Sequence, residues 1–413
     1  MIGFLDDWNK RRDHKQRIYI SYDSSNKNCN AGDIDLIEYG KAKDNKGIPI
    51  FNLAIAFDKT NRVPLFYEEY PGSITDVSQF VHMVDKVTEY GYKKVGFILD
   101  RGYFSKDNIR YMEEGGYAFV IMVKGRKALV SSLVEENRGT FETEHDHSIR
   151  AYHVYGKTVK ARLYEDDTQD RYFHIYFNPS KHAAERERLE LTLDRFKIYM
   201  DKHIGDVVTS SKACQEYFTL KYDKAGHLVG YSERKDVIKR ELDLCGYFCI
   251  VTSEEMTASQ ALIHYKGRDV SEKLFSTDKS FIGSKSMRVQ TTQALSAKIF
   301  VEFIALIVRN RMYNLLKETM LRLETKPNYM TVPAALRELE KIEMVRRGNG
   351  HYRLDHAVTK KQKTILSAFG LSDTDVKSIA IEIGSQLSGN QTPTDKAPEE
   401  DDDYGEDTFT IID

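Results

Sequence analysis

The chain has 413 residues, of which 41% are hydrophobic and 30% are charged, enough for two or three domains with sizeable cores. No apolar run is long enough to span a membrane, and the first sixteen residues are too polar for a signal peptide. We therefore expect a cytoplasmic protein without a membrane partner. The four cysteines are too few and too scattered to form a disulfide framework.

Charge is unevenly distributed along the chain. The formal net charge is −2, but residues 395–413 hold nine acids and one lysine, a net −8, which leaves +6 for residues 1–394. A mildly basic body is compatible with a polyanionic partner without being evidence for one. The acidic end has too little apolar surface to offset its ordering entropy, so residues 386–413 are predicted to be a disordered tail.

The first 124 residues predict a sheet with helices packed on it. Helices are predicted at residues 75–90 and from Ser105 to the glycines at 115 and 116. The predicted order is three strands, a helix, a strand, a helix and a strand. That order implies a mixed sheet and is the one expected for a ribonuclease H-like core, in which the first and fourth strands are neighbours. The strands are predicted at residues 17–25, 47–57, 62–70, 93–100 and 117–123.

The remaining chain interrupts and then completes this pattern. Residues 125–245 contain further strand-like runs and one strongly charged helix, and we interpret them as a β-rich insertion subdomain. A strand at 246–253 and a long apolar helix at 298–320 follow. Two helices around the hairpin-like RRGNGHYRL predict a C-terminal helical or winged-helix-like unit. The expected organisation is an N-terminal remnant (1–16), the first part of the core (17–124), the insertion (125–245), the second part of the core (246–325), the C-terminal unit (326–385) and the tail (386–413).

Two aspartates follow apolar strand residues. Asp23 lies at the polar end of the first predicted strand in ISYDSS, and Asp100 ends the fourth in FILDRGYFS. Each alone could begin a turn or cap a helix, as we interpret Asp58 and Asp76. On neighbouring strands, however, the two carboxylates would repel each other and be within reach of one divalent cation. Oxygen ligands favour Mg²⁺ or Mn²⁺, and a third carboxylate, for which Glu272 is the candidate, would complete a two-metal site for phosphoryl transfer.

A second group of polar residues lies in YKGRDVSEKLFSTDKS, residues 265–280. At about 100° per helical residue, Tyr265, Arg268, Glu272 and Lys279 fall on one narrow stripe. The spacing alone also fits the solvated face of a surface helix.

Together these residues resemble the DDE transposases of bacterial insertion sequences, in the group marked by Y-(2)-R-(3)-E-(6)-K. Tyr265, Arg268, Glu272 and Lys279 match all four positions of that signature. The segment from Asp100 to Tyr103 matches D-x-G-[FY] around the second acid, and SYDSS is similar to the segment around the first. The similarity extends over most of residues 17–325.

The resemblance implies a metal-dependent enzyme that cleaves double-stranded DNA at insertion-sequence ends and joins the freed 3′-hydroxyl to target DNA. Asp23, Asp100 and Glu272 would be catalytic and would bind two Mg²⁺ or Mn²⁺ ions. Arg268 and Lys279 would contact DNA phosphates, and Tyr265 would pack against the backbone or an unstacked base. A homodimer on paired ends and a nucleoid-associated, cytoplasmic location are implied as well, and a hairpin intermediate is left open.

Two alternatives to an active transposase stay open. The first arises because relatives in this group carry a sizeable end-binding domain before the first aspartate. Here about sixteen residues precede the first strand, so we expect either an N-terminally truncated copy or end recognition by the insertion or the C-terminal unit. A truncated copy could be a non-catalytic DNA-binding remnant. The other alternative is a stand-alone ribonuclease H-like nuclease.

Overall fold

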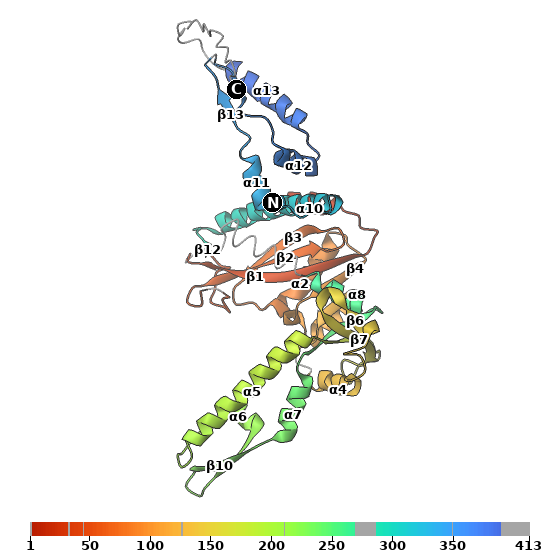
Figure 1. Cartoon of the computed structure of the whole chain (residues 1–413), viewed down its shortest axis with the longest axis vertical. Coiled ribbons are helices and arrows are strands. Elements are labelled where there is room, and N and C mark those ends of the chain that lie inside the picture. Colours follow the sequence, from red (N-terminus) through yellow and green to blue (C-terminus); the bar gives the residue numbers. More distant parts are fainter. Residues whose placement is uncertain are drawn as a thin grey trace, which may run out of the picture. The chain divides into compact units, whose positions relative to one another are not determined.

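A computed structural model describes residues 2–31, 34–43, 45–124, 127–209, 211–268, 286–348 and 350–389 (Figure 1). The chain divides into two compact units, Met1–Asn310 and Arg311–Asp413, and the boundary lies within helix α10 (Thr292–Arg322). In these described ranges, no helix combines the length and apolarity needed to cross a bilayer.

The first unit is built on one large mixed sheet in the order β3-β2-β1-β4-β5-β11-β8-β7-β6, with β12 pairing the end of β1. β2 runs antiparallel to β1 and β3, whereas β4 runs parallel to β1 and β5. The first and fourth strands are therefore neighbours, as the ribonuclease H-like order predicts. The strands are β1 (Ile18–Cys29), β2 (Ile50–Asp58), β3 (Val63–Pro71), β4 (Val95–Leu99), β5 (Ala118–Met122), β6 (Ser148–Ile149), β7 (Val154–Ala161), β8 (Arg171–Phe177), β11 (Tyr247–Thr252) and β12 (Ser286–Met287).

Helices cover both faces of this sheet. On one face, α2 (Asp76–Glu89), α3 (Lys106–Glu114) and α4 (Lys127–Asn137) share a core with β1, β3 and β4. On the other, α1 (Ile2–Lys10) and α10 cover β2, while α8 (Ala258–Lys266) covers β4, β5 and β11. The fold is thus a mixed α/β sheet flanked by helices, as predicted.

The residues expected to be an N-terminal remnant are part of this core. Leu5 of α1 is buried under α10. Asn9 is fully buried, where its amide donates to the Leu65 carbonyl (3.1 Å) and accepts from the Tyr92 hydroxyl (2.9 Å). The Trp8 indole donates to the Pro64 carbonyl (2.9 Å). These contacts fix α1 to β3 and to the residues that precede β4.

The segment expected to be a β-rich insertion divides into two parts. β6, β7 and β8 extend the main sheet, because β8 is apolar enough to be buried beside β11. The rest is mostly helical and has a small core of its own (Figure 1). It consists of α5 (Pro179–Lys202), α6 (Lys212–Tyr217), β9 (Phe218–Tyr222), β10 (Leu228–Glu233) and α7 (Lys235–Leu244).

The second unit contains the end of α10 and a helix–hairpin–helix arrangement in the predicted order. Its elements are α11 (Val332–Leu339), β13 (Met344–Arg346), β14 (Tyr352–Leu354), α12 (Lys360–Ala368) and α13 (Asp373–Gly389). Leu316 of α10 packs with Ala335 of α11 and Ile365 of α12. α13 continues four residues beyond the predicted end of the unit, and the rest of the predicted tail, 390–413, lies outside the described residues.

β1 is longer than its sequence predicts and continues through polar residues to Cys29. Its last part pairs with β2, so the backbone stays hydrogen-bonded. Lys27 is fully buried and its ammonium lies 2.8 Å from the Glu302 carboxylate of α10. This ion pair joins the extended strand to the helix that covers it.

We expect Lys27→Met to lower the free energy of unfolding by about 3 to 5 kcal/mol, because it removes the ammonium that lies 2.8 Å from the buried Glu302 carboxylate. The double variant Lys27→Met/Glu302→Leu should recover most of this loss. Urea denaturation measures both, and Lys106→Met, which removes an exposed partner of Asp166, serves as a near-neutral control. A double variant as unstable as the sum of its single variants would contradict this coupling.

Stability should also depend on pH through His174 of β8. This histidine is fully buried between Thr158 and Thr252, whose hydroxyls lie 2.9 and 3.0 Å from its ring nitrogens, and burial lowers its pKa to about 4. In the unfolded chain this histidine takes up a proton near pH 6.5. Its contribution to the free energy of unfolding is therefore fully present above pH 6.5 and is lost as the pH falls towards 4. Between pH 7 and 4.5 we expect the parent to lose about 2 to 3 kcal/mol more than His174→Asn in urea titrations. Equal losses would contradict this assignment.

Candidate active site

The ladder between β1 and β4 places Asp23 and Asp100 next to each other. Its last pair is Tyr22 with Leu99, and Asp23 and Asp100 directly follow these two residues in the chain. Asp23 pairs on its other side with Ile55, whose side chain is in the core under α10. Because paired residues point to the same face, Asp23 points to the face that α8 and α10 cover.

One prediction about Asp23 is wrong. Asp23 does not end its strand but lies inside β1, one residue past the last pair with β4. The alternative that Asp23 begins a turn is also wrong, because the residues that follow it pair with β2. Asp100 directly follows β4 as predicted, and its side chain makes no capping hydrogen bond to the 3₁₀ helix at Arg101–Tyr103.

Arg268 brings the two aspartates into one site. Its Nη1 lies 3.5 Å from Asp23 Oδ2 and its Nη2 lies 3.7 Å from Asp100 Oδ1. The Tyr265 hydroxyl donates to Asp100 Oδ1 (3.3 Å). Four predicted site residues therefore meet, while Glu272 and Lys279 lie outside the described residues.

Asp23 is in an environment that favours a nearby cation. Burial raises the pKa of Asp23 to about 6, although Arg268, Lys43 and the Ser24 amide act in the opposite direction. The Ser24 amide donates to Asp23 Oδ1 (3.0 Å), and the Lys43 ammonium donates to the Ser24 carbonyl (2.9 Å). Bringing a positive charge to Asp23 would stabilise its carboxylate.

In the described part of the chain, no three His, Cys, Asp or Glu side chains are grouped closely enough to hold a metal ion. The other candidate acids have structural contacts. Asp58 accepts from the backbone and side-chain amides of Asn61 in the turn after β2. Asp76 accepts from the Tyr70 hydroxyl (2.7 Å) at the start of α2.

Comparison with known proteins identifies the family. The sequence pattern of the transposase DDE domain matches residues 27–308, more than half of the chain. The chain belongs to this family. The matched segment includes Asp100 and Glu272 and begins four residues after Asp23. A comparison with curated protein sequences finds no match.

Several solved transposase structures are similar to this transposase-family chain at low identity. The piggyBac transposase synaptic complex with hairpin DNA matches 93% of this chain and 59% of its own, with 8% identity and a TM-score of 0.38. The Mos1 transposase paired-end complex with the left transposon end matches 29% and 38%, with 12% identity and a TM-score of 0.19. The Drosophila P element transposase strand transfer complex matches 93% and 70%, with 12% identity and a TM-score of 0.16. This chain thus corresponds to less than two thirds of the length of the piggyBac chain.

The predicted helical stripe is not what joins Tyr265 to Arg268 in this chain. α8 ends at Lys266, so Tyr265 is in its last turn and Arg268 lies beyond the helix. The Arg268 amide still donates to the Tyr265 carbonyl (3.1 Å). A tight turn after α8, rather than a continuous helix face, therefore brings both side chains to the aspartates.

Lys59, which sequence reasoning missed, caps the end of α8. Its ammonium donates to the carbonyls of Ile263 (2.9 Å) and His264 (3.1 Å) in the last turn of the helix, and the Ile263 carbonyl also accepts from the Gly267 amide (3.0 Å). Burial lowers its pKa to about 8, so the charged form still predominates at pH 7. A Cβ on Gly267 would lie only 2.1 Å from Lys59 Cε, so glycine leaves room for the capping side chain.

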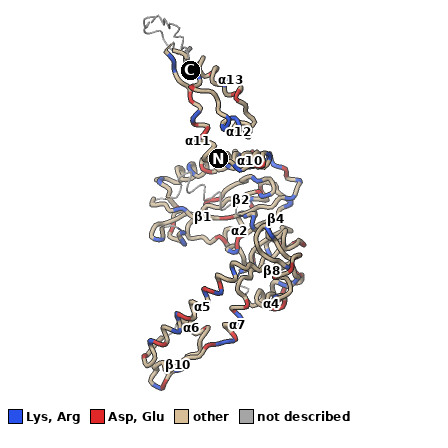
Figure 2. Tube along the Cα trace, in the orientation of Figure 1, with Lys and Arg blue, Asp and Glu red and all other residues tan. Residues whose placement is uncertain are grey.

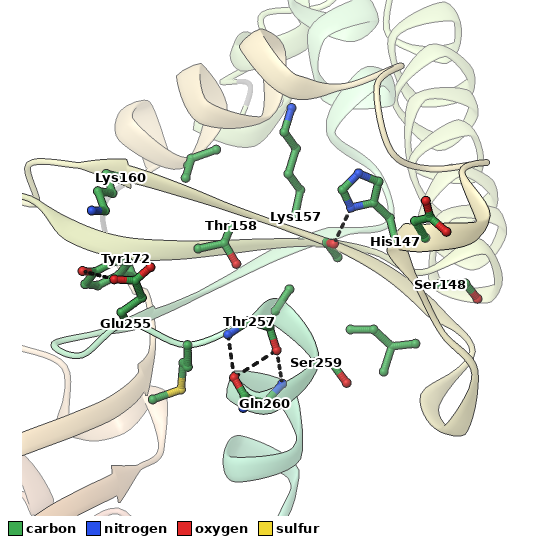
Figure 3. Close-up of a pocket in the computed structure, with 16 residues that line it drawn as sticks. His147, Ser148, Lys157, Thr158, Lys160, Tyr172, Glu255, Thr257, Ser259 and Gln260 are labelled. Carbon is green, nitrogen blue, oxygen red and sulfur yellow. Dashed lines mark hydrogen bonds between the residues drawn. The ribbon is translucent and has the colours of Figure 1, made fainter.

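Two grooves flank α8. The groove beside its first turn has a volume of about 630 Å³ and is lined by Lys157, Lys160 and Ser259 among others (Figure 3). The other, of about 610 Å³, is lined by Arg101 and Tyr265, the neighbours of Asp100, and by the basic residues Lys181 and Lys266. Only the second groove reaches residues next to the aspartates.

We expect Lys59→Ala to lower the free energy of unfolding by about 1 to 2 kcal/mol, because two helix-end carbonyls lose a charged donor. Gly267→Ala should have a similar cost, since the new methyl displaces the Lys59 side chain. In the double variant the cost should be clearly smaller than the sum, because both changes remove the same contact. Urea titrations of the four proteins measure the coupling, and strict additivity would show that Lys59 and Gly267 act separately.

Proposed function

We propose that this transposase cleaves double-stranded DNA at the ends of an insertion sequence and transfers the freed 3′ end into target DNA. Asp23, Asp100 and Glu272 would bind two Mg²⁺ or Mn²⁺ ions. The proposal rests above all on one observation, the contact of a single guanidinium, that of Arg268, with both aspartates. Two carboxylates that contact one guanidinium lie near each other, and this supports a metal ion as their shared partner.

The residues present fit a hard divalent cation. Asp23 and Asp100 offer only oxygen ligands and lie side by side at the end of a parallel ladder, on the face under α8 and α10. Glu272, four residues after Arg268 in the sequence, would add the third carboxylate. When bound, the ions supply an activated water or 3′-hydroxyl and stabilise the leaving oxygen.

The protein's own residues would orient the DNA at these acids. Arg268 and Lys279 would contact phosphates of the insertion-sequence end, and Tyr265, held against Asp100, would pack on the sugar-phosphate backbone or an unstacked base. The groove with Arg101, Lys181 and Lys266 would accommodate the adjoining strand. We further propose the Y-(2)-R-(3)-E-(6)-K group, a homodimer on paired ends, and action in the cytoplasm at the nucleoid.

We expect Asp100→Asn, Asp23→Asn and Glu272→Gln each to abolish Mg²⁺-dependent cleavage, because each keeps its shape and loses a ligand charge. The assay uses a supercoiled plasmid and duplexes carrying the DNA that flanks the gene, with Mg²⁺ or Mn²⁺. Calorimetric titration of Mn²⁺ should show weakened binding for the same variants.

Asp35→Asn is the matched control, since Asp35 is an exposed acid in the loop after β1 and should cut like the parent. A folded Asp100→Asn protein that cuts at the parent rate would refute the metal-site assignment. A folded parent that binds DNA and never cuts would instead identify the non-catalytic remnant. Cutting without any preference for flanking DNA, and without strand transfer, would identify the stand-alone nuclease.

A further inference from the structure

The second unit carries a dense basic segment that the proposed cleavage does not use. Residues 344–363, from the hairpin to the start of α12, hold six Lys or Arg and one Asp, a net charge of +5 in a chain of formal net charge −2. The family match ends at residue 308, before this segment begins. The six cations are all exposed and are marked blue in Figure 2: Arg346, Arg347, Arg353, Lys360, Lys361 and Lys363.

The core of the unit fixes how α12 presents its lysines. Gln362 is fully buried, its side-chain amide donates to the Glu338 carbonyl of α11 (3.1 Å), and its oxygen accepts from the Thr359 amide (2.8 Å). Ile365 and Leu366 are buried as well. Because this side of α12 is held against the core, Lys360, Lys361 and Lys363 stay on the solvent side.

The hairpin adds an arginine on its uncovered face. α13 approaches β14 closely at Gly384, where a Cβ would lie 2.7 Å from the Tyr352 carbonyl and 3.6 Å from Met344 Cε. Met344 therefore faces α13. The next pair, Val345 with Arg353, points to the opposite face of the hairpin, because side chains alternate along a strand.

Contacts within the unit neutralise only part of this charge. Lys363 pairs with Asp373 (2.8 Å) and Arg347 approaches Asp355 (4.0 Å). In the described part of the chain, Arg353 and Lys360 make no ion pair. The three lysines also occupy the first turns of α12, where the helix dipole disfavours cations. A bound polyanion would offset that unfavourable placement.

The basic residues are spaced to reach one DNA duplex. Five residues lie between Leu354 of β14 and Lys360 of α12, so the two are separated by at most about 20 Å. That distance corresponds to about six base pairs along a duplex. The hairpin and the start of α12 can therefore contact phosphates within less than one helical turn.

We propose that the β13–β14 hairpin and the start of α12 form a second DNA-binding surface, which contacts the phosphate backbone of duplex DNA independently of the aspartates. The choice of DNA as the polyanion rests on the proposed function, whereas the basic surface itself does not.

The test is a salt titration of binding to a duplex without divalent metal, using the full chain. The triple variant Arg353→Ala/Lys360→Ala/Lys361→Ala should bind at least about tenfold more weakly at 0.1 M KCl, and the slope of log affinity against log salt should fall by about two to three. The matched control, Lys317→Ala/Arg322→Ala/Lys377→Ala, removes three exposed cations from α10 and α13 of the same unit and should keep the parent slope.

Equal slopes for the parent and the first triple variant, or equal losses in both triple variants, would overturn the surface. The triple variant could instead keep the parent's salt dependence for DNA and lose binding to anionic vesicles. That result would identify a membrane as the partner and overturn the assignment to DNA. If the triple variant does not fold, Lys360→Gln/Lys361→Gln reads the same slope, with an expected fall of about two. Asp100→Asn should keep the parent's slope of log affinity against log salt, because the proposed surface does not use the aspartates. If that variant still cleaved DNA, the catalytic proposal would be rejected and the proposal of a basic surface would stand.

Discussion

Five residue pairs join β1 to β4 in parallel, from Ile18 with Val95 to Tyr22 with Leu99, and the ladder ends just before the two aspartates. Because the register of the two parallel strands is fixed, this ladder alone places Asp23 beside Asp100, and no loop is needed to bring them together. It also decides which face they use, since a slip of one residue would turn Asp23 to the side covered by α2. α8, which covers β4, β5 and β11, then brings Tyr265 and Arg268 to that face.

Burial of polar groups in β1 gives this register its specificity. A slip of two residues would keep each side chain of β1 on its face, but Lys27 must meet Glu302 and Asn26 must meet the loop at residues 41–43. Any other register would leave a buried charge or amide without its partner, which costs more than the contact itself contributes. The polar half of β1 therefore supports the site by excluding alternatives.

The order of the core elements and the proximity of Asp23 to Asp100 could be predicted, because apolar periodicity is a local property of the sequence and adjacent strands follow from that order. The end of β1 could not, since its polar residues resemble a turn until β2 and α10 supply their partners. β8 pairs with β11, some seventy residues away, so its place in the main sheet has no local signal. Lys59 was missed for the same reason, because its acceptors in α8 are about 200 residues distant.

Electrostatics near the aspartates limit how much DNA affinity this face can supply. Two carboxylates oppose the approach of a phosphate, and the charge of Arg268 is already engaged by both of them. A cation paired with an acid neutralises little of a phosphate, so it releases few counterions on binding. Affinity is better supplied by cations such as Arg353 and Lys360 in the second unit, which have no acidic partner among the described residues. Because the acids and the basic surface lie in separate parts of the sequence, the acids can keep the negative charge that a metal ion requires and the basic surface can keep the positive charge that phosphates require.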